Sequence, residues 1–388
     1  MSRIRAVQSA FPAYRYPQRE FTEAIIAIAG AGGALRPAQR KLVARLHASA
    51  GVATRHTALP ISEYETIGGA RGSGGAGRRA AQANDRYIEE ATRLGERALR
   101  SALAAAGIAA SDLDLLIVTS VTGVAVPSLD ALLIPRLGLR PDIKRLPVFG
   151  LGCVAGAAGL ARLHDYLLGW PGQAAALLAV ELCSLTWSAS AMTTPDLVAG
   201  ALFGDGAAAV VASGELARVP PAAAGQPGQA GQPGQPAPAG QQGPLPRVIA
   251  TRSEVYPDST DTLGWRLGAD GFRIVLTAEL ADVVERRLSG SVTAFLSDCG
   301  LTVDDISRWI CHPGGPKVLD AAQRALKLPD GALATSRQSL SEAGNMSSVS
   351  VLHILELTVA CDPPAAGSYG LMIGLGPGVS AELLLLKW

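Results

Sequence analysis

Short apolar runs and stretches with helical spacing alternate along the chain. Continuous apolar runs at 113–119 and 174–180 predict strands buried on both faces, and a third such run follows the turn at 203–206. Apolar residues at helical spacing predict helices over 21–47 and 273–299. Buried strands interleaved with amphipathic helices are typical of α/β proteins, so we predict that fold class.

The second half of the chain repeats the pattern of the first. A shift of about 193 positions places the helix end, acidic turn and strand of one half over those of the other. The same shift brings Cys153 to within a residue of Asn345, and Gly206 with the strand after it corresponds to Gly378 with the last strand at a smaller offset of 172 positions. We therefore predict two duplicated α/β units, packed about a pseudo-twofold axis.

A compositional break separates the two units. Residues 220–246 consist almost wholly of Pro, Gly, Gln and Ala, with no periodicity and little to bury. We expect a flexible surface loop there, without a catalytic role. The predicted organisation is an N-terminal half at 1–219, this loop at 220–246, and a C-terminal half at 247–388.

Composition narrows the kind of protein. Of the 388 residues, 48% are apolar and 17% are charged, and the net charge is +1. So small a charge favours neither nucleic acid nor an anionic membrane as a partner. No apolar run approaches the roughly 20 residues that span a bilayer, and the N-terminus lacks the apolar stretch of a signal peptide. The five scattered cysteines have no Cys-x-x-Cys spacing, so we expect no metal site, no disulfide framework, and a reducing cytoplasm.

One cysteine lies where a reactive thiol would be useful. Residues 148–160 run from an apolar strand through Gly150 and Gly152 to Cys153, and then into a helix of small residues. The positive end of a helix dipole lowers the pKa of a nearby thiol, so we expect Cys153 to carry more thiolate than an ordinary cysteine. The alternative is a buried cysteine that acts as a small hydrophobic residue.

His312 and Asn345 complete a candidate catalytic set. His312 follows the short strand 309–311, and Asn345 occupies in the second half the place that Cys153 has in the first. The pseudo-twofold would bring a nucleophile, a base and a neutral donor to one centre. Such a set suits acyl transfer between thioesters, and the two donors would stabilise the enolate left when a malonyl thioester loses carbon dioxide. Each residue alone also has a structural explanation, as a core histidine or as a helix N-cap.

The segments around these residues resemble the Cys-His-Asn motifs of type III polyketide synthases, the chalcone synthase-like enzymes. They read Phe-Gly-Leu-Gly-Cys-Val-Ala-Gly-Ala at 149–157, Cys-His-Pro-Gly-Gly-Pro at 311–316 and Gly-Asn-Met-Ser-Ser-Val-Ser-Val-Leu at 344–352. The resemblance covers essentially the whole chain and implies a homodimer with a thiolase-like fold, in which two α/β halves form a layered αβαβα core. It also implies an acyltransferase that loads an acyl-CoA starter, extends it with malonyl-CoA by decarboxylative condensation, and releases a cyclised product. Neither a carrier protein nor a tightly bound cofactor is expected.

The resemblance assigns roles to residues by matching position. Cys153 would hold the acyl group, while His312 and Asn345 would activate it and drive decarboxylation. Phe203 matches an aromatic gatekeeper between the CoA tunnel and the cavity, and Arg45 matches a residue that grips CoA phosphates. The other implied substrate-binding positions line the cavity or form the cyclisation loop: Cys183, Ile274, Gly374, Leu375, Gly376, Pro377 and Gly378.

Some positions depart from the family's pattern. Leu375 replaces the Phe of the usual Gly-Phe-Gly-Pro-Gly loop, and Ile274 replaces a second gatekeeper aromatic. Val126 falls where a larger residue from the partner subunit can line the cavity. Smaller walls, together with an aromatic content of only 5%, favour aliphatic acyl starters and pyrone- or resorcinol-type products.

Two other functions stay open on the sequence alone. A ketoacyl-acyl-carrier-protein synthase of the initiating type resembles this fold and shares the triad, but it condenses once and needs a carrier protein. A non-catalytic subunit of the same fold would bind a partner or an acyl chain, although an intact triad argues against it. The Asn-Met-Ser-Ser and Gly-Leu-Gly-Pro-Gly segments favour the polyketide synthase.

Overall fold

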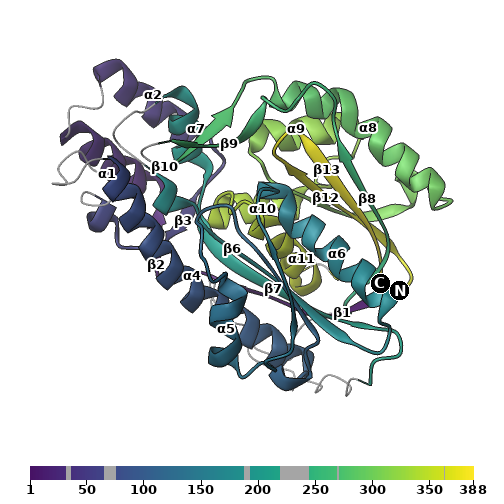
Figure 1. Cartoon of the computed structure of the whole chain (residues 1–388). Coiled ribbons are helices and arrows are strands. Elements are labelled where there is room, and N and C mark those ends of the chain that lie inside the picture. The colour runs from purple at the N-terminus through teal and green to yellow at the C-terminus, as the bar shows by residue number, and fades with distance from the viewer. Residues whose placement is uncertain (32–35, 65–75, 188–192, 219–243, 269–270, 362) are drawn as a thin grey trace.

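The computed structural model (Figure 1) describes all residues except 32–35, 65–75, 188–192, 219–243, 269–270 and 362. The loop predicted at 220–246 therefore lies almost entirely outside the described residues. The domain boundaries that the sequence places on either side of it stay a prediction.

Among the described residues, nine strands form one mixed sheet, and its two ends belong to different halves of the chain. From the centre outward, the N-terminal half contributes β1 (Ser2–Ala10), β7 (Asp205–Gly214), β6 (Ala174–Leu182), β4 (Leu115–Thr119) and β5 (Lys144–Val148). The C-terminal half contributes β8 (Arg247–Val255), β13 (Ser380–Lys387), β12 (Tyr369–Gly376) and β11 (Ile306–Cys311). The halves meet where β1 pairs with β8 in antiparallel fashion.

The four innermost strands of each half have the same order and the same directions, and β5 adds a fifth strand at the edge of the N-terminal half. In the first half, β1–β7 and β7–β6 are antiparallel pairs and β6–β4 is parallel. In the second half, β8–β13 and β13–β12 are antiparallel and β12–β11 is parallel. The predicted fold class, an α/β fold built from two duplicated halves, is confirmed.

The helices and the sheet are arranged in layers, as Figure 1 shows. The central layer holds α6 (Ala155–Gly169) and α11 (Val349–Cys361), and each of these helices contacts strands of both halves. The outer faces are covered by α4 (Ala76–Ala106) and α5 (Leu129–Leu137) on one half, and by α8 (Leu280–Asp298) and α9 (Pro316–Ala325) on the other. A further helix, α10 (Ala334–Ala343), packs against α11 and strand β3 (Thr54–Thr57).

Alternation along each strand builds this layering. Leu177 in β6 points to the central helices and its neighbour Leu178 points to α4, and both are fully buried. Leu384 and Leu385 in β13 divide in the same way between the central layer and the outer layer. Each such leucine contributes roughly 2 kcal/mol relative to an exposed one. The two-sided burial explains why the strands are continuously apolar, and it produces the αβαβα order.

The remaining elements gather beside the sheet at one end of the molecule (Figure 1). They are α1 (Gln18–Ala31), α2 (Pro37–Ala48) and α7 (Thr194–Leu202), with the antiparallel pair β2 (Tyr14–Pro17)–β3 (Thr54–Thr57) and the hairpin β9 (Leu263–Gly268)–β10 (Gly271–Leu276). The helix predicted over 273–299 is wrong at its start, because these first residues pair with β9 and the helix begins only at Leu280. Phe272 and Ile274 lie two residues apart on one face of the hairpin, and this two-residue period is that of a strand rather than a helix.

Long helices in this fold are amphipathic, and the most apolar one is short. The 31 residues of α4 include many charged side chains on the outer side, whereas α11, buried nearly all round, has 13 residues. Roughly 20 apolar residues are needed to cross a bilayer. Within the described ranges, no helix is both long and apolar enough to do so.

Candidate active site

Cys153 lies at the start of the central helix of the N-terminal half. It belongs to a 3₁₀ turn, Gly152–Val154, that runs directly into α6. Gly152 has a φ of +53°, and a Cβ built on it would lie 2.6 Å from the Cγ atom of Pro377. Only glycine fits, because both the backbone conformation and this contact exclude a side chain. The turn holds Cys153, which is 7% exposed, against the C-terminal loop.

The surroundings of Cys153 favour the neutral thiol in the free enzyme. Burial raises the pKa of Cys153 to about 12; the Ser347 hydroxyl acts to lower it and the Glu181 carboxyl acts to raise it. The expected lowering of the thiol pKa is therefore wrong for the free enzyme, because loss of water outweighs the helix end. Burial also lowers the pKa of His312 to about 4, so its imidazole is neutral near pH 7.

His312 follows the last residue of β11. Its backbone N–H donates to the carbonyl oxygen of Ile373 in β12, at 2.9 Å. The side chain is 2% exposed, and its Nδ1 atom has no hydrogen-bond partner among the described residues. A buried, neutral imidazole of this kind can take a proton from an acid that comes within reach.

Asn345 is fixed by hydrogen bonds at both its backbone and its side chain. Its N–H donates to the carbonyl oxygen of Leu202 at 2.8 Å, and its own carbonyl oxygen accepts from the N–H of Gly204 at 3.0 Å. Its Oδ1 atom accepts from the N–H of Ser347 at 2.8 Å. The orientation of the side-chain amide leaves Nδ2 as the group that can donate to a substrate oxygen.

Ser347 connects Asn345 to Cys153. Its hydroxyl lies close enough to Cys153 and to Glu181 to lower the pKa of each, although it is in hydrogen-bond geometry with neither. Its N–H holds the Asn345 side chain, as described above. The nucleophile of one half and the amide of the other are therefore separated by a single residue.

His312 is connected to the same centre through β12. Its hydrogen-bond partner Ile373 precedes Gly374, and a Cβ on Gly374 would lie 3.2 Å from the Cγ2 atom of Val154. Val154 is the residue next to Cys153. The structure thus brings the three residues of the sequence-derived set onto adjoining segments.

Sequence reasoning missed Glu181, the most heavily hydrogen-bonded acid of this region. It is fully buried near the end of β6 and accepts from the N–H of Val121 at 3.0 Å, the hydroxyl of Thr122 at 3.0 Å and the hydroxyl of Ser348 at 2.6 Å. Burial raises the pKa of Glu181, and these hydrogen bonds act to lower it. The signal in the sequence was a single acidic residue at the end of an otherwise apolar strand.

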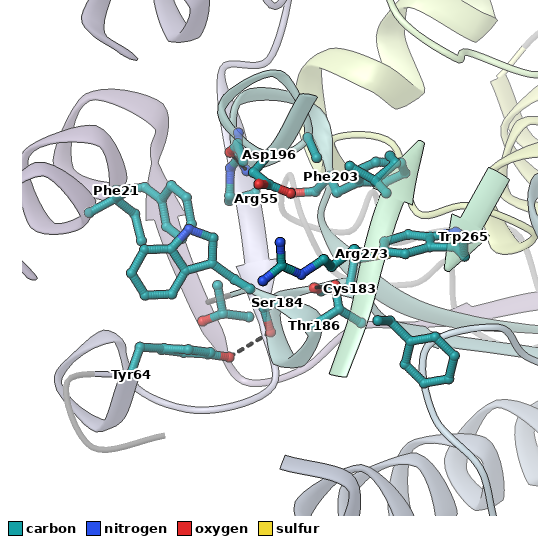
Figure 2. A pocket seen from close by; sticks show the side chains of 17 residues that line it. Phe21, Arg55, Tyr64, Cys183, Ser184, Thr186, Asp196, Phe203, Trp265 and Arg273 are labelled. Carbon is teal, nitrogen blue, oxygen red and sulfur yellow. Dashed lines mark hydrogen bonds between the residues drawn. The ribbon is translucent and has the colours of Figure 1, made fainter. Parts of the chain in front are cut away.

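Phe203 lines a pocket (Figure 2) and connects that pocket to Asn345. Phe203 forms an isolated β-bridge with Asn345, and its ring lies 6.3 Å from that of Trp265 between centroids. Cys183 and Ile274 line the same pocket. Burial raises the pKa of Cys183, and a charge on Cys153 adds to this shift, so the two cysteines are near neighbours. Three cavity residues named from the sequence therefore share one pocket beside the candidate nucleophile.

The C-terminal segment 374–378 runs against the turn that carries Cys153. Pro377 meets Gly152 at the contact described above. Gly378 donates its N–H to the carbonyl oxygen of Leu263 in β9, at 2.9 Å. This segment therefore joins the cysteine turn to the hairpin that borders the pocket.

The cyclisation-loop residues 374–378, Arg45 and Val126 lie outside the lining of this pocket. Leu375 is buried and packs into the outer apolar layer of the C-terminal half. Arg45 is exposed on α2. Val126 is 93% exposed on the loop between β4 and α5. The predicted roles of these side chains stay predictions.

Comparison with protein families gives two matches that together cover most of the chain. Residues 1–215 match the N-terminal domain of chalcone and stilbene synthases, and residues 247–388 match the C-terminal domain. A 1,3,6,8-tetrahydroxynaphthalene synthase of Streptomyces peucetius subsp. caesius is 50% identical over 385 residues, which are 99% of this chain and 93% of that protein. A putative chalcone synthase of Bacillus subtilis (strain 168) is 32% identical over 79% of this chain and 80% of its own.

Solved structures give the same result. The 1,3,6,8-tetrahydroxynaphthalene synthase of Streptomyces coelicolor A3(2), a bacterial type III polyketide synthase, superposes with a TM-score of 0.83 at 28% identity, over 100% of this chain and 99% of that one. PKS-I of the brown alga Ectocarpus siliculosus superposes with a TM-score of 0.82 at 25% identity, over 100% and 98% of the two chains.

The layered fold and the buried cysteine at the start of its central helix define an acyltransferase of the thiolase-like class. Within that class, the chain belongs to the chalcone and stilbene synthase family, the type III polyketide synthases. It therefore condenses malonyl-CoA units iteratively, with decarboxylation, and forms a cyclised aromatic product. Enzymes of this family use CoA-linked substrates and need neither a carrier protein nor a tightly bound cofactor, so the carrier-protein-dependent alternative is not favoured.

Proposed function

We propose that this polyketide synthase makes a polyhydroxylated naphthalene from malonyl-CoA, with Cys153 as nucleophile, His312 as base and Asn345 as donor. The observation that carries the proposal is the meeting of these three residues on adjoining segments beside one pocket. The 50% identity to a tetrahydroxynaphthalene synthase supports this product class, in place of the aliphatic starters and pyrone- or resorcinol-type products that the small cavity walls favour. Malonyl-derived two-carbon units can supply every carbon of such a skeleton.

Loading begins with proton transfer, because the free thiol is neutral. His312 takes the proton of Cys153 as the sulfur attacks the thioester carbonyl of the starter. A bond forms between Cys153 and the acyl carbon, the bond from that carbon to the CoA sulfur breaks, and CoA leaves as a thiolate that recovers the proton. The high pKa of Cys153 means that attack and proton transfer occur together.

Extension depends on the donors that face the thioester oxygen of malonyl-CoA. Nδ2 of Asn345 and an N–H of His312 donate to this oxygen while carbon dioxide leaves, and the electron pair of the broken bond forms an enolate. The enolate carbon attacks the acyl-Cys153 carbonyl, and the Cys153 thiolate is expelled. The lengthened chain is then on CoA, and Cys153 takes it back for the next cycle.

The enzyme acts as a homodimer in this proposal. Val126 is an apolar residue almost fully exposed to solvent. Other exposed apolar residues are Val124, two positions before it, and Phe149 and Leu151, just before Cys153. Burial of such residues against a second copy would remove apolar surface from water. The loop of Val126 would then reach the partner's cavity, as its position in the family implies.

Incubation of the purified protein with malonyl-CoA alone, followed by mass spectrometry, tests the proposal. We expect carbon dioxide release and a naphthol-type product from the wild type. Cys153→Ala should abolish acyl loading, whereas Asn345→Ala should retain loading and lose decarboxylation. An active enzyme whose products are all pyrones would contradict the proposed product class.

A further inference from the structure

Arg55, in β3, is a buried cation in the wall of the pocket (Figure 2). The residue is 1% exposed. Burial lowers the pKa of Arg55 to about 9 and the nearby Asp205 carboxylate acts to raise it, so the guanidinium is charged near pH 7. A cation that has lost its water is stable only when hydrogen bonds replace that water. The partners of Arg55 therefore show what this charge does in the fold.

These partners are carbonyl groups at the end of α7, together with the side chain of Gln18. Nη1 of Arg55 donates to the carbonyl oxygens of Gly200 and Phe203, at 2.7 and 2.6 Å, and Nη2 donates to that of Ala201 at 2.5 Å. Nε and Nη2 also donate to Oε1 of Gln18, at 3.1 and 2.6 Å. Carbonyl groups in the last turn of a helix lack intrahelical donors and attract positive charge. The guanidinium therefore caps α7 from the side.

The segment that Arg55 caps is the one that pairs with Asn345. Phe203, whose carbonyl accepts from Arg55, forms the isolated β-bridge with Asn345. On either side of Phe203, the carbonyl of Leu202 accepts from the N–H of Asn345, and the N–H of Gly204 donates to its carbonyl. Both backbone hydrogen bonds of Asn345 thus end on the segment that the buried guanidinium holds.

This segment sets Asn345 against the other half of the molecule. The Oδ1 atom of Asn345 is held by Ser347, which belongs to the same half of the chain. The hydrogen bonds to residues 202–204 instead fix the Asn345 backbone relative to the N-terminal half, which carries Cys153. A displacement of about 1 Å is enough to slow enzymatic chemistry by about a hundredfold. A shift of the capped segment would therefore affect any step that needs the Asn345 amide.

We propose that Arg55 is a positioning residue for decarboxylation, which holds the Phe203 segment so that the Asn345 amide faces the thioester oxygen of malonyl-CoA. Arg55 touches no reacting atom, because its donors are used inside the protein. The inference rests on the proposed function, in which Asn345 serves decarboxylation and is not needed for loading of Cys153. The two half-reactions should therefore depend on Arg55 to different extents.

Rapid-quench mass spectrometry measures loading, as acylation of Cys153 by acetyl-CoA, and release of carbon dioxide from malonyl-CoA measures decarboxylation. Arg55→Lys keeps the charge but loses the planar fork that reaches several carbonyls at once. We expect it to slow decarboxylation by about tenfold or more and to change loading less than about twofold.

Leu99→Ala is the matched control for a loss of stability. Leu99 is fully buried in α4, within the outer apolar layer of the N-terminal half, and does not line the pocket. The cavity destabilises the fold without touching residues 200–204. We expect the ratio of decarboxylation to loading in this variant to equal that of the wild type. An equal change of this ratio in Leu99→Ala and Arg55→Lys would overturn the inference.

Gln18 provides a second route to the same test, should Arg55→Lys not fold. Gln18→Leu removes the acceptor that orients the guanidinium and leaves the charge in place, so it should slow decarboxylation less than Arg55→Lys does, with the same selectivity. Gln18→Glu keeps an acceptor for Arg55 and should restore part of the rate. Equal losses of loading and decarboxylation in Gln18→Leu would contradict the positioning role.

A double-mutant cycle with Asn345→Ala shows whether Arg55 acts through Asn345. An amide that has been removed cannot be displaced, so Arg55→Lys should slow decarboxylation less than about twofold in the Asn345→Ala background. Equal losses in the two backgrounds would overturn the inference, and so would a wild-type rate of decarboxylation in Arg55→Lys. A wild-type rate of decarboxylation in Asn345→Ala alone would instead contradict the proposed function itself.

Discussion

Gly152 and Pro377 touch across the interface between the two halves of the molecule, at a distance that leaves no room for a methyl group. A Cβ atom on Gly152 would lie 2.6 Å from Cγ and 2.8 Å from Cδ of Pro377. The contact joins the turn of the candidate nucleophile to the C-terminal loop of the other half. The position of Cys153 is therefore set by a segment more than half the chain away in sequence.

We expect Gly152→Ala to lower the free energy of unfolding by about 1–3 kcal/mol and to reduce activity strongly. The left-handed backbone costs an alanine roughly 1 kcal/mol, and the overlap with Pro377 must be relieved by moving the turn. Urea unfolding and the initial rate of malonyl-CoA consumption measure the two effects. Gly107→Ala is the control, because Gly107 has a φ of +65° and nothing within 4 Å of a Cβ. Equal losses of activity in both variants would show that the contact with Pro377 does not position Cys153.

The ionisation of Cys153 gives a second prediction, in which two substitutions act in opposite directions. Because the pKa of Cys153 is raised to about 12, its alkylation by iodoacetamide in the free enzyme should keep rising with pH above about 8.5, where ordinary thiols are half ionised. The Ser347 hydroxyl lowers this pKa, so Ser347→Ala should slow alkylation. Glu181 raises it, so Glu181→Gln should speed alkylation.

Peptide mass spectrometry follows Cys153 in these experiments, and the exposed Cys361 in the same digest serves as an internal reference. Circular dichroism identifies any variant that does not fold. The same direction of change in both variants would contradict the opposing roles of Ser347 and Glu181. A rate for Cys153 that levels off near pH 8.5 in the wild type would contradict the raised pKa.

Glu356 in α11 makes the stability of the fold depend on pH. Burial raises the pKa of Glu356 from 4.5 to about 7, while its Oε2 atom accepts from the N–H of Ser9 at 2.9 Å. The folded state thus favours the protonated acid, so its contribution is present at low pH and is lost as the pH rises from about 4.5 through about 7. The loss amounts to roughly 3 kcal/mol.

Glu356→Gln keeps an acceptor for Ser9 and cannot ionise. Relative to the wild type, this variant should therefore gain stability at pH 8 compared with pH 5, by up to roughly 3 kcal/mol in urea unfolding. Glu285→Gln is the control, since Glu285 is a surface residue whose pKa the hydrogen bond from Arg324 lowers. We expect the pH dependence of stability in Glu285→Gln to differ little from that of the wild type. If the stability of Glu356→Gln has the same pH dependence as that of the wild type, the Glu356 carboxyl is not the source of this pH dependence.

The sequence predicted the architecture because the fold repeats a local pattern. The strands β4 and β11 occupy equivalent places in the sheet, as the shift between the halves requires. Continuous apolar runs correctly indicated strands buried on both sides. The hairpin β9–β10 was missed, because its first residues also fit helical spacing and only pairing across the turn decides between the two periods.

At the site, the sequence identified residue types, and the structure supplied their surroundings. Cys153 at a helix start suggested a lowered thiol pKa, since the helix dipole is a local property that a sequence displays. The larger effect, burial, comes from segments that only the tertiary fold brings together, with Ser347 and Glu181 among them. Trp187 and Arg273, which line the pocket, were also missed, because neither belongs to a motif and the pocket is built from distant elements.

Val126 provides the test of the proposed homodimer. Its side chain is 93% exposed in the single chain, while Asn84 holds the preceding loop through two hydrogen bonds of 2.8 Å to the backbone of Val124. A loop that is anchored at its base and apolar at its tip fits insertion into a second copy. We expect Val126→Asp to weaken dimerisation at least about tenfold in sedimentation equilibrium, because a buried carboxylate would lose its water.

Leu216→Asp is the matched control for that measurement, since Leu216 is 73% exposed on the turn after β7 and has no proposed partner. We expect its dimerisation to equal that of the wild type. Val126→Met should leave the dimer intact and alter the ratio of products, because a longer side chain would enter the partner's cavity. If the dimer tolerates Val126→Asp and Val126→Met leaves the product ratio unchanged, this loop does not line the partner's cavity, even in a dimeric enzyme.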